Sequence, residues 1–147
     1  MDITKANILG TYLALIVLIL CSLIFIFRLL GLSKIEHLLG IIFLLTSLPI
    51  TYLLLTAGQF QRPTIYYVQI GIMLVFMIVE LILDYLFNFD FRHTKWMVIT
   101  YAMLFFAATG GMIGIASLSG KPYSIIAIFL WLIMAFLAFF QRYKTGM

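Results

Sequence analysis

Five long apolar runs, separated by short polar segments, are the feature that most limits the possible fold. A helix rises 1.5 Å per residue, so about 20 apolar residues cross the roughly 30 Å of hydrocarbon in a bilayer. The runs cover residues 8–27, 38–57, 64–87, 96–118 and 122–140. The sequence therefore predicts an all-α integral membrane protein, with residues 1–147 forming a single transmembrane domain, a compact bundle of five helices.

The composition argues against an ordinary soluble domain. Hydrophobic residues make up 65% of the chain and charged residues 10%, whereas soluble domains are about half apolar and a quarter charged. The first apolar run is too long for the core of a signal peptide, and no small-residue cleavage motif follows it, so we expect it to be retained as a helix. Its Cys21 is the only cysteine in the sequence, which excludes an intramolecular disulfide.

The basic residues lie between or beyond the apolar runs and divide unequally between the two sides of the membrane. One side carries Lys5, Arg62 and Lys121. The other carries Arg28, Lys34, Arg92, Lys95, Arg142 and Lys144. Because cytoplasmic loops are enriched in Lys and Arg, we expect the amino terminus outside and the carboxyl terminus in the cytoplasm, in the cell (inner) membrane. The charges form no patch, so membrane lipid and not nucleic acid is the expected partner.

Residues at the ends of the runs predict where helices begin. Ser33 and Glu36 have the spacing of a capping box at the start of the second helix. Pro63 and Pro122 suit the first turns of the third and fifth helices, where a missing N–H costs nothing. Thr94 is placed to cap the fourth helix. The short connections between these points make consecutive helices antiparallel neighbours.

Two acidic residues, Glu80 and Asp84, lie inside the third apolar run. Their spacing places them on one helix face, which continues through Gln69. Carboxylates are costly in hydrocarbon, so this face is expected to point into the bundle or a wet cavity. One interpretation is a site for a proton, a cation or a small ligand. The other is structural, with Asp84 paired to Arg92 or Lys95 and Glu80 protonated and hydrogen-bonded.

The second run combines a central proline with several hydroxyl groups. Pro49 removes one backbone hydrogen bond and frees the carbonyl of Leu45, so we expect a bend there. Thr46 or a neighbouring hydroxyl is expected to bond to the freed backbone. Together with Tyr52, these residues predict a kinked helix that lines a ligand-binding cavity opposite Glu80. The alternative is a kink that only improves helix packing.

The fourth run carries a stripe of small residues. Gly110, Gly111 and Gly114 recur at helical spacing, and Gly110 and Gly114 form a G-x-x-x-G pair. Such a stripe lets another backbone approach closely. It predicts a packing face for a helix of the same chain or, alternatively, for a second copy in a homodimer.

The sequence shows no motif for catalysis, nucleotide binding or metal binding. His37 and His93 lie in predicted connections without the spacing of metal ligands. We therefore predict no catalytic residue, metal or cofactor, and an enzyme is not favoured. The predicted function is to bind or transport a small molecule, proton or cation through the acidic site on the third helix. The alternative is a non-catalytic accessory or assembly subunit of a larger membrane complex.

Overall fold

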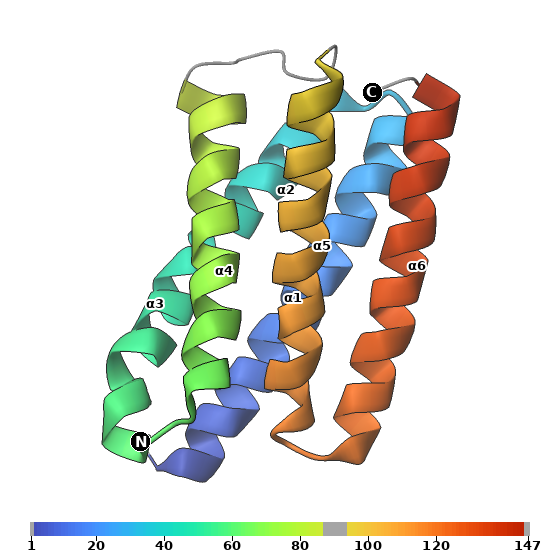
Figure 1. Cartoon of the computed structure of the whole chain (residues 1–147). Coiled ribbons are helices and arrows are strands. Elements are labelled where there is room, and N and C mark those ends of the chain that lie inside the picture. The colour runs from blue at the N-terminus through green and yellow to red at the C-terminus, as the bar shows by residue number, and fades with distance from the viewer. Residues whose placement is uncertain (1, 87–93, 146–147) are drawn as a thin grey trace.

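The computed structural model describes residues 2–86 and 94–145, which form helices joined by short turns (Figure 1). The helices are α1 (Ile3–Leu29), α2 (Ser33–Leu45), α3 (Ser47–Thr56), α4 (Thr64–Glu80), α5 (Lys95–Ser117) and α6 (Lys121–Thr145). A 3₁₀ turn, Ala57–Phe60, extends α3, and a π-helical segment, Leu81–Leu86, extends α4.

Five helical rods in the described part of the chain are long and apolar enough to cross a membrane. They are Ile3–Leu29, Ser33–Phe60, Thr64–Leu86, Lys95–Ser117 and Lys121–Lys144. Their number and order confirm the all-helical, five-rod arrangement that the hydropathy pattern predicts, with α2 and α3 together forming the second rod. The first residues of α1 and the last turn of α6 lie at opposite ends of the bundle, as an odd number of crossings requires (Figure 1).

Helix α1 is the centre of the bundle. It packs against α2, α3, α5 and α6, and its Ala14, Val17 and Leu18 are completely buried. Helix α4 completes the bundle beside α3 and α5. Helix α6 is the least buried rod, and its Phe129 and Phe136 are each 67% exposed. An apolar face of this kind is stable against lipid chains, which are as apolar as the side chains themselves.

The second rod is interrupted at Thr46, between α2 and α3, three residues before Pro49. The interruption that the proline predicts is therefore present, but its hydrogen bonding differs from the expectation. The Thr46 hydroxyl donates to the carbonyl of Phe43 at 2.5 Å. A threonine hydroxyl in a helix reaches the carbonyl three or four residues before it, so the freed carbonyl of Leu45 is out of its range.

The helix starts follow the sequence signals only in part. Helix α2 begins at Ser33 without a side-chain hydrogen bond at its cap, so the predicted capping box is wrong. Glu36 instead forms an ion pair with Arg28, with 2.7 Å between Oε1 and Nη2. A carboxylate binds a guanidinium more strongly than it binds a backbone N–H that already faces water, so Glu36 pairs with Arg28 and does not cap the helix. Helix α5 begins directly after Thr94, as expected, but the Thr94 side chain makes no hydrogen bond at this cap.

The glycine stripe of α5 faces neighbouring helices of the same chain. A Cβ on Gly114 would collide with the Gln69 amide of α4, and a Cβ on Gly111 would lie 3.5 Å from the same side chain. Gly110 faces α6, where Trp131 Nε1 would lie 3.9 Å from an added Cβ. The stripe therefore serves intramolecular packing in this structure, and Gln69 fills the space that the two glycines leave.

Candidate functional site

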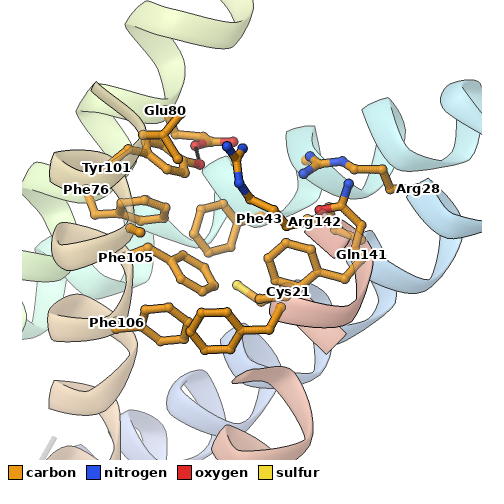
Figure 2. A pocket seen from close by; sticks show the side chains of 17 residues that line it. Cys21, Arg28, Phe43, Phe76, Glu80, Tyr101, Phe105, Phe106, Gln141 and Arg142 are labelled. Atoms are coloured by element: carbon orange, nitrogen blue, oxygen red, sulfur yellow. Dashed lines mark hydrogen bonds between the residues drawn. The ribbon is translucent and has the colours of Figure 1, made fainter. Parts of the chain in front are cut away.

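A cavity of about 140 Å³ lies in the half of the bundle where α1 and α6 end and α2 and α5 begin. Side chains from these four helices and from α4 line it (Figure 2). Phenylalanine is the commonest residue in the wall: Phe25, Phe43, Phe76, Phe105, Phe106 and Phe139. The polar lining residues are Cys21, Arg28, Glu80, Tyr101, Gln141 and Arg142. One carboxyl group and two guanidinium groups therefore reach a mostly apolar chamber.

The aromatic wall is one continuous set of ring contacts centred on Phe76 and Phe105. The ring centroids of these two residues are 5.4 Å apart and meet edge to face. Phe43 contacts Phe76 at 6.1 Å, and Phe25 contacts Phe105 at 5.7 Å, again with steep interplanar angles. Edge-to-face pairs are the favoured geometry for aromatic rings. The rings therefore support one another and hold the chamber's shape.

Glu80 reaches the cavity because it continues the buried face of α4. Met77 and Met73, one and two turns before it on that face, are 2% and 0% exposed. The Glu80 carboxyl accepts a hydrogen bond from the hydroxyl of Tyr101 on α5, drawn as a dashed line in Figure 2. The expectation that Glu80 faces the bundle interior is confirmed. Its partner Tyr101 could not be chosen from the sequence, because the pairing depends on the rotation of α5.

Tyr101 also separates the cavity from the outside of the bundle. The same side chain lines a second hollow between α4 and α5, together with Val79, Leu83, Trp96 and Leu104. This outer groove is apolar and lies on the surface of the two helices. A single phenol ring thus stands between Glu80 and the face that lipid would cover.

Asp84 lies one turn beyond Glu80, within hydrogen-bonding reach of its carboxyl group. It belongs to the π-helical segment that begins directly after Glu80. Segments of this kind are rare and are frequent at functional sites. Of the two basic partners expected for Asp84, Arg92 lies outside the described residues. The structure thus brings the two acids together, as their spacing predicts.

Arg28 is held at the cavity by two interactions. Its guanidinium pairs with Glu36, where Nε donates to Oε1 at 2.7 Å, and lies 5.7 Å from the centroid of the Phe25 ring. In Figure 2 Arg28 and Gln141 lie on the side of the chamber away from Tyr101. The sequence analysis treated Arg28 only as a loop charge, because the neighbouring residues in the sequence do not indicate that its side chain lines a cavity.

Three residues expected at the site lie elsewhere. Gln69 packs against the glycines of α5, at the other end of α4. Thr46 bonds to its own helix, and Tyr52 on α3 is 48% exposed. The second rod still reaches the cavity, but through Gly40 and Phe43 of α2. Which face of a membrane helix points inward cannot be read from hydroxyl groups alone, since these bond equally well to their own backbone.

Gly40 has a structural reason to be glycine. A Cβ at this position would collide with the hydroxyl of Tyr85, which donates to the carbonyl of His37 at 3.3 Å. The His37 ring packs on the Tyr85 ring with a centroid distance of 4.9 Å. These contacts fix the π-helical segment against the start of α2. His37 therefore has a packing role, while His93 lies outside the described residues.

Gln141 is a further residue that the sequence analysis missed. It is 2% exposed, although it belongs to the last, mostly exposed helix. A polar residue directly after the last apolar run is ordinarily assigned to the interface, so only the fold shows that it lines the cavity. Among the described residues, no three His, Cys, Asp or Glu side chains gather into a candidate metal site.

Comparisons of the chain with protein-family models, with curated proteins and with solved structures find no match in any of the three. The cavity is therefore the source of the functional argument.

Proposed function

We propose that this chain is a multi-pass protein of the cell membrane that binds a small molecule or cation at the acidic site on its third rod. The observation that supports this most is the position of Glu80, whose carboxyl group lines a cavity with six phenylalanine rings. A carboxyl group at membrane depth is costly and is retained mainly where it pairs or has a function. Here its hydrogen-bond partner, Tyr101, leaves it at the edge of unfilled space.

The cavity is proposed to open on the cytoplasmic side. It lies at the end of the bundle that carries Arg28, Lys34, Lys95, Arg142 and Lys144, the side that the distribution of basic residues assigns to the cytoplasm. A reporter enzyme fused after residue 147 is then expected to be active only if it works in the cytoplasm. Activity of a reporter that works only outside would contradict this orientation.

Beyond the cavity, buried side chains close the bundle in the described part of the chain. Val17, Met73 and Met112, which lie beyond the cavity, are at most 1% exposed. The geometry therefore supports a binding site that is reached from one side, and not a continuous pore. Transport would require a second conformation in which these side chains separate.

The alternative, an accessory subunit of a larger complex, gains no comparable support. The broad apolar face of α6 is exposed, but lipid chains cover such a face without a protein partner. An accessory role also leaves the open space beside Glu80 without a purpose.

Chemical modification of Glu80 tests the proposal without knowledge of the ligand. Diisopropylcarbodiimide is a small apolar reagent that adds to a neutral carboxylic acid and leaves a stable N-acylurea, which peptide mass spectrometry locates. In protein reconstituted in lipid, we expect modification at Glu80 and none at Glu36, which is paired with Arg28. An unmodified Glu80 would show that the site is closed to small molecules and would contradict the proposal.

A matched pair of variants on α5 shows whether the reagent uses the cavity. Ala102 lines the cavity, and Ala107 is an exposed residue on the same helix. Ala102→Phe is expected to fill the space and to reduce the modification of Glu80 by about tenfold, whereas Ala107→Phe leaves it unchanged. Equal modification in the two variants would mean that the reagent reaches Glu80 by another route.

A further inference from the structure

The cavity wall carries a partial negative charge even where it is apolar. The face of an aromatic ring is negative, and a cation within about 6 Å of a ring centroid is attracted to it, most strongly away from water. Six phenylalanine rings and Tyr101 surround this space. The chain already uses this interaction at the rim, where the Arg28 guanidinium lies 5.7 Å from the Phe25 centroid.

The charged side chains around the cavity leave the acids in the better position to meet a ligand. Arg28 is neutralised by Glu36 at 2.7 Å, and both side chains of this pair are mostly buried. Arg142 also lines the cavity, and in Figure 2 its guanidinium points toward Glu80, but it comes from the exposed last turn of α6, where water screens its charge. Glu80 and Asp84 lie side by side at the Tyr101 side of the chamber. An incoming anion would meet the Glu80 carboxyl group, with Asp84 beside it, and the negative ring faces, whereas a cation is attracted to both.

We infer that the ligand of this cavity is a small organic cation, of the alkylammonium or arylammonium class, with its charge between the Glu80 carboxyl group and the rings of Phe76 and Phe105. The inference rests on the proposed function and names the ligand class of the same site. The volume of about 140 Å³ is close to that of an engineered cavity that holds one benzene molecule. The bound group is therefore of roughly that size, and any longer part of the molecule must extend out of the cavity.

Three probes of one shape test the sign of the ligand's charge. They are benzyltrimethylammonium, its uncharged isostere neopentylbenzene, and the anion phenylmethanesulfonate. Binding to the protein in nanodiscs of zwitterionic lipid is measured by calorimetry, with empty nanodiscs subtracted. We expect the cation to bind at least about tenfold more tightly than the neutral isostere, and the anion to bind most weakly. Equal or tighter binding of the isostere or the anion would overturn the inference.

Variants separate the carboxylate from the rings. Glu80→Gln keeps the shape but removes the acid that can ionise beside a bound cation, so it is expected to weaken cation binding about tenfold and to leave binding of the neutral isostere unchanged. Phe76→Leu or Phe106→Leu keeps an apolar wall without a ring and is expected to weaken the cation several-fold. Phe129→Leu, at an exposed position of α6, is the control with no expected effect. Unchanged cation binding in all three cavity variants would overturn the inference.

The two proposals fail in different ways. If carbodiimide does not reach Glu80, the proposed function is wrong, and the inferred ligand class, which depends on it, is wrong as well. If carbodiimide modifies Glu80 and Ala102→Phe prevents this, but the cation is not preferred over its isostere, only the ligand class is wrong. Thermal unfolding of each variant in detergent checks that a loss of binding does not reflect a loss of fold.

Discussion

Near the amino terminus of α1 the helices approach closely through small residues, whereas near its carboxyl terminus phenylalanine rings hold them around a cavity. In the first region an added Cβ on Gly10 would lie 3.0 Å from Ile115. The Thr11 hydroxyl there bonds to the carbonyl of Asn7 at 2.8 Å and to Ser119 at 2.6 Å. In the second region, polar side chains such as Glu80 and Arg28 line the cavity and do not join the helices through backbone carbonyls.

The side chains explain why one region closes and the other does not. Between the two regions, Met73 and Met112 are completely or almost completely buried, and methionine is flexible enough to fill irregular gaps. Phenylalanine is rigid and packs edge to face, so a ring of such residues retains space that a flexible side chain would fill. The closed half therefore contributes close packing to the fold, whereas the aromatic half retains the cavity.

The largest effect is expected from filling the close contact between α4 and α5. Gly114→Leu would drive a side chain into the space that the Gln69 amide fills and is expected to cost about 3 kcal/mol, because Gln69 must leave that space and the two helices must adjust to the larger residue. Gly71→Leu is the control, since a Cβ on Gly71 meets nothing within 4 Å. Thermal unfolding in detergent measures both. Equal stability of the two variants would mean that the close contact is absent in the membrane.

A smaller loss is expected from the polar contact between α4 and α5 in the aromatic half. Glu80→Leu removes the acceptor of the Tyr101 hydroxyl and is expected to cost about 1–3 kcal/mol, the usual cost of an unpaired buried polar group. Glu80→Gln keeps a carbonyl oxygen for the same bond, so its stability should stay within about 1 kcal/mol of the parent. A Gln variant as unstable as the Leu variant would show that the acid has a structural role that the amide cannot fill.

The hydroxyl network of the closed half is expected to contribute less. Thr11→Val keeps the side-chain shape and removes the bonds to Asn7 and Ser119, for an expected loss of about 1 kcal/mol, typical of hydrogen bonds between membrane helices. Thr51→Val is the matched control, because the Thr51 hydroxyl bonds only within its own helix, to Ser47 at 2.7 Å. If both variants unfold at the same temperature, the network does not hold α1 to the α5–α6 connection.

The closed half was largely predictable from the sequence, and the aromatic half only in outline. Helical spacing alone placed Gly111 and Gly114 on one face. Because close helix contacts need small residues, that face could be predicted to pack against another helix. Hydropathy could not separate Phe76, which lines the cavity, from Phe129, which is exposed, since lipid and core accept the same residue. Intramembrane acids are rare enough that Glu80 could be predicted to face inward.

Contacts between residues on different helices could not be predicted from the sequence, for a different reason. The pairing of Tyr101 with Glu80 depends on how α5 is rotated against α4, and the reach of Arg28 to Glu36 spans a turn. Both are set by packing between rods and not by spacing within one rod. In the same way, the rotation of α3 places Tyr52 on the outside, although its position in the sequence suggested the cavity.

The smallest effect on stability is expected from the ion pair at the cavity rim, where it also gives the sharpest test of the charge argument. Glu36→Gln removes the charge that pairs with Arg28 at 2.7 Å, but the amide oxygen can still accept a hydrogen bond from the guanidinium, so the expected loss is about 1 kcal/mol. Binding of benzyltrimethylammonium should nevertheless weaken several-fold, because the Arg28 charge is then no longer neutralised beside the cavity. Calorimetry on the reconstituted protein measures this change.

The double variant Arg28→Gln, Glu36→Gln decides whether the change is electrostatic. It removes both charges of the pair, so the net charge beside the cavity returns to that of the parent, and cation binding should recover to within about twofold of the parent value. If the double variant binds as weakly as Glu36→Gln, the loss comes from a displaced α2 and not from the freed guanidinium. Raising the salt concentration separates the two causes again, because salt screens the charge on Arg28 but does not restore a helix position. A weakened affinity that is insensitive to salt would therefore place the effect in the packing of Gly40 and Phe43, the α2 residues that line the cavity.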